Sequence, residues 1–436
     1  MAYDIIIGRD KSDKEKFGDK GLIFLGKGYV KMGNYTSLSN KIWMDVARSH
    51  VILVSGKRGS GKSYSLSAIA EGLSNLPQET SKNIASIIFD TMGIFWTMKY
   101  KNEKDSALLK EWDLEAKSLP VKIFVPFGKE LEYSSKKIPF DSTFALKASE
   151  LEAEDWISLF NLEFTSLTSA LIERIISNLK LKSRNFSINE IEKLIEDDLK
   201  ASKETKEIAS SLFIAADTWG IFDKSGKGTE INDLINPGTT TILDVSIYSS
   251  ISSFNIRALV IGLICRKLFQ KRMDERKIEE LDALRHGQDY LSYKSFVQNP
   301  LIWVFLDEVH EFLGKSEKTP ATDALIQLLR EGRQPGISLV MATQQPGKLH
   351  SDALTQADII ISHRVTAKPD IEALNEIMQT YLLENIKQQM DNLPSTKGSA
   401  IVLDDNSERI YPIRVRPKFT WHGGESPSAI KAEIKL

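Results

Sequence analysis

Cysteine is almost missing from this sequence, since Cys265 is the only one among 436 residues. One cysteine excludes a disulfide within the chain and a metal site built from several thiolates. Cys265 lies in the apolar segment ALVIGLICRKLF, so we expect a buried side chain that serves packing. The six histidines are scattered without the spacing of metal ligands, so we also expect no zinc site.

Long apolar runs are missing as well. No stretch reaches the roughly 18 to 20 apolar residues that cross a bilayer, so we expect no membrane insertion. The first residues, MAYDIIIGRDKSDKEKFGDK, place a short apolar run before the charges, which is the reverse of a secretory signal. These two features predict a cytoplasmic protein.

The chain also lacks an excess of charge of either sign. Its 57 lysines and arginines nearly balance 59 acidic residues, and the net charge is -2. This balance argues against a whole-surface nucleic-acid binder, but it leaves room for a basic channel inside an oligomer. Some local clusters mix basic and aromatic residues as nucleic-acid grooves do, although a solvated face is the favoured interpretation of each. They are Lys27 with Lys31, the group Arg266, Lys267, Lys271 and Arg272, and the loop 285–294 with His286, Tyr290, Tyr293 and Lys294.

The order of strand-like and helix-like patterns indicates an α/β protein. The length exceeds what one hydrophobic core usually serves, which predicts two or more domains. Buried-type strands alternate with amphipathic helices, as in a parallel sheet covered on both faces. We expect a short N-terminal β segment or reduced barrel at 1–45, the two parts of the core at 46–147 and 237–396, a helical insertion at 148–236, and a hairpin with a tail at 397–436.

Two local patterns refine this organisation. Ser187 and Glu190 in SINE have the spacing of a capping box, which predicts a helix start inside the insertion. The charged stretch 273–295 is typical of a solvated loop with a helical turn, so we expect the preceding helix to end near 272.

A glycine-rich motif carries the first sign of chemistry. GKRGSGKS, residues 56–63, fits G-x-x-x-x-G-K-[ST] and lies between a buried strand and a helix. Such a turn binds phosphates through backbone N–H groups and the positive end of the helix. Lys62 would reach the β and γ phosphates of ATP, and Ser63 would hold Mg²⁺. The predicted nucleotide-binding residues are Gly56, Lys57, Arg58, Gly59, Ser60, Gly61, Lys62, Ser63 and Tyr64.

A second motif, LIWVFLDEVHEF, brings two acids to the end of an apolar strand. The carboxyl ends of such strands are where open α/β sheets bind ligands. Asp307 would order the Mg²⁺ shell, and Glu308 is the candidate general base for water that attacks the γ phosphate. Hydrolysis is therefore the favoured reaction, and two surface acids at a strand end are the alternative.

Two further segments could complete the site. The buried strand SLVMATQQP ends in Gln344 and Gln345, either of which could hold the attacking water, although a solvated strand end is an open alternative. REGRQPG places Arg330 and Arg333 three residues apart on one face of a helix end. Either arginine could reach a neighbour's phosphates, or both could simply complement the helix dipole.

Together these motifs carry a resemblance to a known family. GKRGSGKS, ILDVS, LDEVHEF, LLREGRQPGISLVMATQQP, HRVTAKPD and RPKFTWHGG follow in an order that resembles the HerA family of hexameric DNA translocases, within the FtsK–HerA superfamily. The likeness covers roughly residues 22–425. It implies a RecA-like P-loop NTPase core with a mostly parallel sheet, and an ATPase that uses Mg²⁺.

The resemblance also implies partners and roles. The family forms homohexameric rings with ATP between subunits and double-stranded DNA in the pore, and the rings usually work with a nuclease or another effector. By this likeness Lys62, Ser63, Asp307, Glu308 and Gln344 belong to the nucleotide site. Arg333 is the better candidate for a finger acting in trans, and Arg330 is the second.

The chain departs from the family pattern in two places. The β segment before the phosphate loop has only about 45 residues, where the family has a complete small β-barrel. The strand after the first core helix ends in Asp90-Thr91-Met92-Gly93-Ile94-Phe95, so Ile94 stands where the family has an acid and we assign no catalytic role there. Besides a DNA motor, a ring scaffold that recruits and switches an effector enzyme and a motor for protein export therefore stay open.

Overall fold

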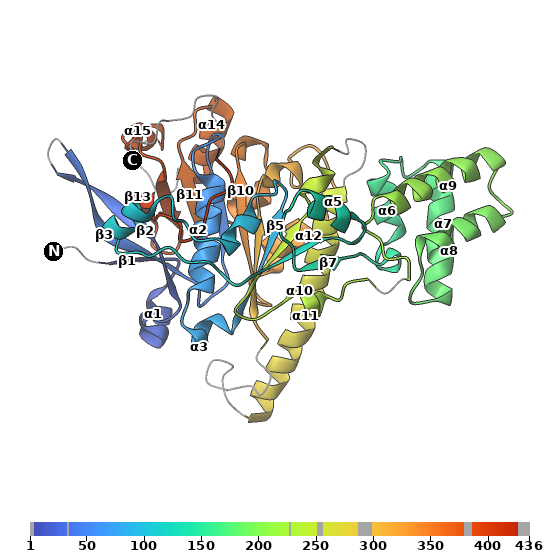
Figure 1. The fold of residues 1–436 in the computed structure, drawn as a ribbon, viewed down its shortest axis with the longest axis horizontal. Coiled ribbons are helices and arrows are strands. Elements are labelled where there is room, and N and C mark those ends of the chain that lie inside the picture. Colours follow the sequence, from blue (N-terminus) through green and yellow to red (C-terminus); the bar gives the residue numbers. More distant parts are fainter. Residues whose placement is uncertain are drawn as a thin grey trace.

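A single large sheet organises the chain. The computed structural model describes residues 4–32, 35–225, 228–250, 256–286, 299–378 and 386–425. In this part of the chain, 13 strands form a sheet in the order β1-β3-β2-β13-β12-β11-β4-β10-β9-β5-β8-β6-β7 (Figure 1). The strands are β1 Ile5–Ile7, β2 Leu22–Met32, β3 Tyr35–Asp45, β4 Val51–Ser55, β5 Ile84–Asp90, β6 Val121–Pro126, β7 Ser142–Phe144, β8 Thr240–Asp244, β9 Leu301–Leu306, β10 Ile337–Thr343, β11 Ile359–His363, β12 Ser399–Asp404 and β13 Arg409–Val415.

The eight strands from β11 to β7 are all parallel and form the core of the sheet. Their side chains alternate between two faces, each with its own apolar cluster. Val51 and Leu53 of β4 belong to one cluster, and Ile52 and Val54 belong to the other. This period of two with both faces covered confirms the predicted α/β fold with a mostly parallel sheet.

Helices supply the cover on both faces. The side chains of α2 pack in one apolar cluster, and those of α11 and α12 pack in the other. The helices are α1 Lys11–Phe17, α2 Lys62–Ser74, α3 Gln78–Ser81, α4 Ser106–Glu111, α5 Glu130–Ser135, α6 Ala153–Leu159, α7 Leu167–Lys182, α8 Ile188–Asp197, α9 Lys203–Thr218, α10 Ile231–Leu234, α11 Ile256–His286, α12 Thr322–Glu331, α13 Ser351–Thr355, α14 Lys368–Met378 and α15 Ile386–Asp391.

Helix α11 overturns one expectation. It runs without a break from Ile256 to His286, and its far end extends past the other elements in Figure 1. The predicted loop from residue 273 is therefore wrong as far as 286. Ion pairs between neighbouring turns, such as Lys271–Glu275 and Arg276–Glu280, stabilise the charged half as helix. Although this helix is long, no helix in the described ranges is long and apolar enough to cross a membrane.

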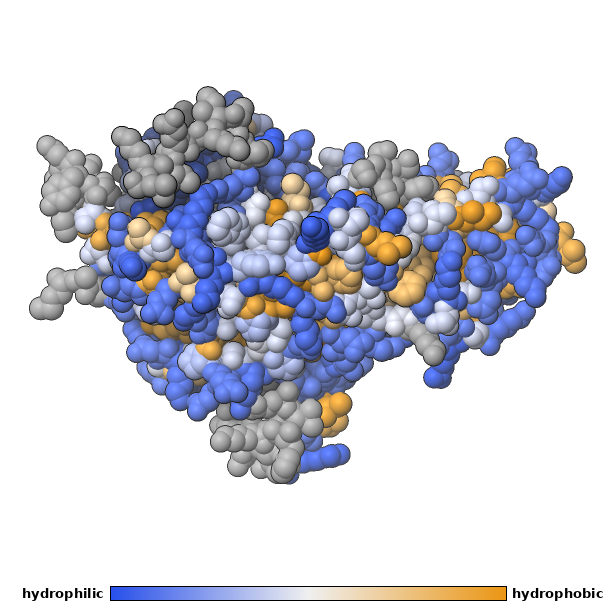
Figure 2. Space-filling view, in the orientation of Figure 1, coloured by the Kyte–Doolittle hydropathy of each residue, from blue (hydrophilic) through white to orange (hydrophobic). Residues whose placement is uncertain are grey.

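Four helices, α6 to α9, form the insertion at one end of the molecule (Figure 1). Trp156 lies at its centre, with ring centroids 4.9 to 5.7 Å from those of Phe160, Phe213 and Phe222. Ser187 and Glu190 form the predicted capping box. Figure 2 shows a mostly hydrophilic surface, with hydrophobic residues scattered over the middle of the molecule and over this end. The sequence boundaries given for the domains remain predictions.

The two chain ends extend the same sheet. The predicted C-terminal hairpin is present as β12 and β13, which pair antiparallel. β13 pairs with β2, and β2 pairs with β3, so the N-terminal strands continue the core sheet. Helix α1, between β1 and β2, was not expected from the sequence.

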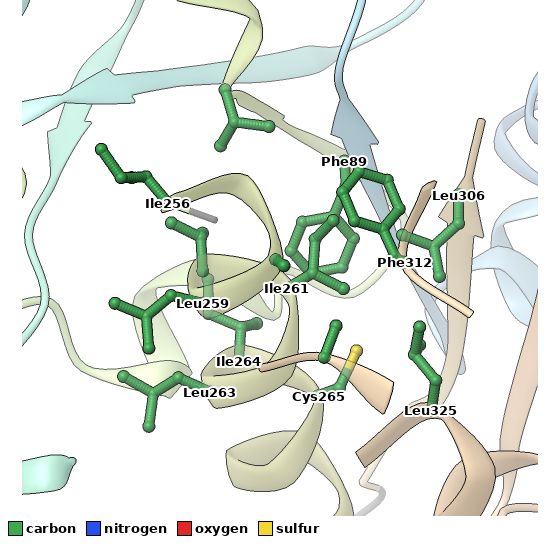
Figure 3. Packing of buried hydrophobic residues seen from close by; sticks show 14 of the residues in the cluster. Phe89, Ile256, Leu259, Ile261, Leu263, Ile264, Cys265, Leu306, Phe312 and Leu325 are labelled. Atoms are coloured by element: carbon green, nitrogen blue, oxygen red, sulfur yellow. The ribbon is translucent and has the colours of Figure 1, made fainter. Parts of the chain in front are cut away.

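Cys265 has the packing role that its apolar sequence context predicts. Its side chain is fully buried on α11, and Figure 3 shows it between Ile261 and Leu325 of α12. Burial raises the pKa of its thiol. The residue is therefore an inert part of the core.

Candidate nucleotide-binding and hydrolysis site

The glycine-rich turn joins β4 to α2 at the carboxyl edge of the parallel strands, as its sequence context predicts. A Cβ atom on Gly56 would lie 2.5 Å from Oγ of Ser60 and 2.7 Å from Cβ of His363, so only glycine fits. Gly59 has a φ of 74°, which also favours glycine. The turn consists of Gly56, Lys57, Arg58, Gly59, Ser60 and Gly61, and Lys62, Ser63 and Tyr64 open α2.

Lys62 is a buried lysine beside two carboxylates. Its Nζ lies 3.4 Å from the carbonyl oxygen of Lys57, so the side chain lies along the turn. Burial lowers the pKa of Lys62, while the charges of Glu308 and Asp307 act in the opposite direction. The ammonium group is therefore near both acids of the second motif.

Ser63 and Asp307 meet directly. The Ser63 hydroxyl donates a hydrogen bond of 2.5 Å to Oδ2 of Asp307, which is almost fully buried after β9. Burial raises the pKa of Asp307, and the hydrogen bond from Ser63 partly offsets this effect. A hydroxyl and a carboxylate side by side are oxygen donors of the kind that Mg²⁺ takes together with waters and phosphates. These two residues therefore fit the metal.

Glu308 has a strained backbone and a free oxygen. Its φ of 51° and ψ of 43° lie in the left-handed region, which is rare for residues other than glycine. Gln344 Nε2 donates a hydrogen bond of 2.5 Å to Oε1. Oε2 accepts no hydrogen bond within the described part of the chain and lies 3.5 Å from Nδ1 of His310. Burial and the charge of Asp307 raise the pKa of Glu308, which favours a proton acceptor.

The two arginines are not on one helix face. Helix α12 ends at Glu331, so Arg333 lies in the turn that follows, and the expected shared face is wrong. Arg330 pairs with Asp352 of α13, with 2.6 Å between Nε and Oδ2. Arg333 pairs with Asp358, with 2.9 Å between Nη2 and Oδ2. Both arginine side chains are more than half exposed and are paired with acids of their own chain.

Arg333 lies at the amino ends of the parallel strands, and the phosphate loop lies at their carboxyl ends. Its partner Asp358 accepts a hydrogen bond from the N–H of Val51, the first residue of β4. Gly56 follows the far end of that strand, five residues later, which corresponds to about 17 Å. Arg333 therefore cannot act on the phosphate loop of its own chain.

The basic residues in the cluster on α11 form ion pairs with acidic residues of the same chain. Arg266 pairs with Asp155, Lys267 with Glu150 and Lys271 with Glu275, while Arg272 is fully buried. The nucleic-acid interpretation of Arg272 is therefore wrong, and so is the solvated-face alternative.

The other basic positions are only partly described. Lys27 Nζ lies 4.9 Å from the ring centroid of Trp112. The side chains of Lys31 and His286 and the residues Tyr290, Tyr293 and Lys294 lie outside the described residues.

Sequence reasoning missed two features near the site. Nε2 of the buried His363 lies 2.8 Å from Oγ of Ser65 on α2, directly behind the phosphate loop. Asp90 and Asp244 are register partners at the ends of β5 and β8, and both are buried. His363, Asp90 and Asp244 each end a buried strand. A polar residue at that position is the sequence signal that would have identified them. No cluster of three or more histidine, cysteine or acidic side chains suited to a metal occurs among the described residues.

A parallel sheet with a phosphate loop after β4 and an Asp-Glu pair after β9 defines a P-loop NTPase. The chain belongs to the family described as the central domain of helicase HerA, whose model matches residues 30–268. It is thus a HerA-type P-loop ATPase by family.

A relative supports this assignment at the level of sequence. The DNA double-strand break repair helicase HerA of Pyrococcus furiosus is 24% identical over 184 residues, which cover 39% of this chain and 31% of the relative. The chain therefore spans less than a third of that relative in the match.

Solved structures share the fold. VirB4 of Thermoanaerobacter pseudethanolicus has a TM-score of 0.52 and 12% identity, over 91% of this chain and 96% of that one. The bacterial conjugative coupling protein TrwB has a TM-score of 0.50 and 13% identity, over 86% and 87% of the two chains. These likenesses confirm the RecA-like α/β fold.

Proposed function

We propose that this chain hydrolyses ATP as one subunit of a homohexameric ring that translocates on or unwinds double-stranded DNA. The observation that carries the hydrolysis is the arrangement of Glu308. One carboxylate oxygen is held by Gln344, and the other accepts no hydrogen bond within the described part of the chain. A strained backbone beside a phosphate loop is typical of functional positions.

Substrate binding follows from the turn and its first helical residues. Backbone N–H groups of the turn and the amino end of α2 bind the phosphates, and Lys62 adds a positive charge. Ser63 and Asp307 would hold Mg²⁺, which would supply charge neutralisation at the phosphates.

Glu308 then acts as the general base. It accepts a proton from the attacking water at the carboxylate oxygen that has no hydrogen bond. Gln344 fixes the other oxygen and thereby the orientation of the carboxylate. Positioned general bases typically contribute about 10²- to 10⁴-fold to a rate.

Assembly with a second copy is supported by the position of the candidate finger. Arg333 is far from its own phosphate loop, so a role in catalysis requires the site of a second copy. Guanidinium groups suit the charge that develops on a phosphoryl group in transfer. Arg330 is the second candidate for the same role.

DNA as the track is supported by family membership and by the relative described as a DNA repair helicase. A nuclease or another effector enzyme is the partner that we propose for the ring. A cytoplasmic location remains a prediction. A scaffold role, in which hydrolysis switches an effector, is the alternative that the following experiment separates.

The test measures particle mass and ATP turnover together, with and without duplex DNA, for the native chain and Arg333→Ala. We expect a particle of six subunits, turnover that DNA accelerates, and loss of turnover in the variant without loss of assembly. A ring of six whose turnover ignores DNA at every salt concentration would favour the scaffold. A chain that neither assembles nor hydrolyses ATP contradicts the proposal.

A further inference from the structure

The carboxylate that holds Arg333 has three partners. Asp358 lies just before β11 and is 5% exposed. Its Oδ1 accepts a hydrogen bond of 2.8 Å from the N–H of Val51. Its Oδ2 lies 2.7 Å from Nδ1 of His50 and 2.9 Å from Nη2 of Arg333. Arg333 therefore shares one oxygen with a buried histidine.

His50 provides Asp358 with a second positively charged partner. The ring is buried, and its Nε2 lies 3.2 Å from Oδ2 of Asp45, which is itself bonded by Arg9. Burial alone would lower the pKa of His50, but the hydrogen bonds to Asp358 and Asp45 raise it to about 9. His50 is thus positively charged at neutral pH. If Arg333 leaves, Asp358 keeps a charged partner and a backbone N–H donor.

Among the described residues, Asp358 is the side-chain partner of Arg333. The Arg333 side chain is 55% exposed, and the ion pair with Asp358 is the contact that fixes the guanidinium. The backbone of the turn is fixed separately, because Nε of the buried Arg272 donates a hydrogen bond of 2.8 Å to the carbonyl oxygen of Pro335. The side chain can therefore move while the turn stays in place.

We propose that Asp358 is a positioning residue that holds Arg333 against its own chain until the nucleotide site of a second copy competes for it. The buried His50 makes release possible, since Asp358 stays satisfied afterwards. This inference rests on the proposed function, in which Arg333 acts on a neighbouring subunit.

The chain offers a matched comparison. Arg330 is held in the same way by Asp352, but that carboxylate belongs to the short surface helix α13 and has no contact with His50. Asp358→Asn keeps an oxygen for Val51, and its amide would point N–H groups toward both Arg333 and Nδ1 of His50. Asp352→Asn removes the charge that holds Arg330. Each variant frees one arginine and leaves the other in place.

The first measurement tests the hold without any activity. Phenylglyoxal modifies exposed arginines, and peptide mass spectrometry separates Arg330 from Arg333. We expect Asp358→Asn to speed modification of Arg333 about two- to five-fold, the effect of losing an ion pair whose arginine side is exposed, with Arg330 unchanged. Asp352→Asn should do the reverse, and Asp358→Glu should restore the native rate at Arg333. An unchanged rate at Arg333 in folded Asp358→Asn overturns the hold.

Arg333→Met provides a second test in case Asp358→Asn fails to fold. It leaves Asp358, His50 and Val51 intact, so we expect an unchanged midpoint of thermal unfolding. A clear drop in the midpoint would mean that Asp358 depends on Arg333, and it would overturn the release.

The second measurement asks whether the hold limits catalysis. ATP turnover per subunit is followed against protein concentration for the native chain and both Asn variants. Asp358→Asn should reach half of its maximal turnover at about two- to five-fold lower concentration, and Asp352→Asn should match the native chain. If the turnover of Asp358→Asn fell only in proportion to its folded fraction, Asp358 would be a structural residue and not a positioning residue. A native chain with no turnover at any concentration would contradict the proposed function instead, while the phenylglyoxal result would still test the hold.

Discussion

Oγ of Ser63 lies 2.5 Å from Oδ2 of Asp307, although 244 residues separate the two along the chain. Ser63 is in the first turn of α2, and Asp307 follows β9. Parallel strands end at the same edge of a sheet, and β10 alone lies between β4 and β9. The fold therefore builds the proposed metal site from two segments that could not meet locally.

Removing the Ser63 hydroxyl should weaken binding of Mg²⁺ with ATP. At a ligand concentration about 100 times the Kd, the native chain should gain about 2.7 kcal/mol of stability, and a site weakened tenfold should gain about 1.4 kcal/mol. Thermal unfolding of the native chain and Ser63→Ala with ATP measures this difference, and EDTA should abolish it. Ser67→Ala is the control, because its hydroxyl bonds the carbonyl of Ser63 on the same helix. Equal gains in native and Ser63→Ala would contradict the metal role.

Glu308→Gln should separate binding from hydrolysis. The glutamine still offers an oxygen to Gln344, so the site keeps its shape and ATP should bind with nearly native affinity. Turnover should fall by about 10²- to 10⁴-fold, because the amide cannot accept the proton of water. Calorimetric ATP binding and a phosphate-release assay check both parts.

Glu311→Gln is the matched control for that variant. Glu311 lies three residues away and pairs with Arg257, with 2.9 Å between Nη2 and Oε2. Its turnover should stay within a few-fold of native. If Glu308→Gln turned over ATP at the native rate, another group would have to be the base.

The sequence alone predicted the features that depend on neighbouring residues. The phosphate loop, the strand before Asp307 and the capping box at Ser187 each need only neighbouring residues, and each lies where the pattern predicts. Gln344 was one of two candidates, and it is the one that contacts Glu308. These features are local or follow from the shared edge of parallel strands.

Other features depend on contacts that no local pattern reveals. The charged half of α11 resembles a loop, but ion pairs between its turns and the packing of the buried Arg272 on the turn at Pro335 stabilise it as helix. The pairing of Arg333 with Asp358 depends on where β11 begins in the sheet. The contact between Asp90 and Asp244 could be predicted only from the order of the strands in the sheet, since 154 residues separate the two along the chain.

Asp90 and Asp244 form a buried pair of carboxyl groups next to the proposed site. They are in register on β5 and β8 and are almost fully buried. Asp90 accepts hydrogen bonds from four backbone N–H groups, and Asp244 accepts two from Ser246. Burial and then the charge of Asp244 raise the pKa of Asp90 to about 7, and burial raises the pKa of Asp244.

These shifts give stability a pH dependence with a definite sign. In the unfolded chain both carboxyls titrate near their ordinary pKa of about 3.9. Between about pH 4 and pH 7 the folded chain therefore binds more protons than the unfolded one. The pair's contribution to stability is full below this window and is lost as the pH rises through it.

Asp244→Asn should reduce that loss. The asparagine keeps an oxygen for Ser246 and removes the charge that opposes ionisation of Asp90. Between pH 5 and pH 8 the free energy of unfolding should fall less in the variant than in the native chain, by on the order of 1 to 3 kcal/mol. Urea unfolding at the two pH values measures the difference, and titrating groups elsewhere cancel because both chains share them. Asp90→Asn is the contrast. Its oxygen could still accept from Met92, Gly93 and Ile94, but its NH2 group would face the buried N–H of Phe95 and destabilise the chain at both pH values. Parallel pH dependences of the native chain and Asp244→Asn would show that the two carboxyls titrate independently.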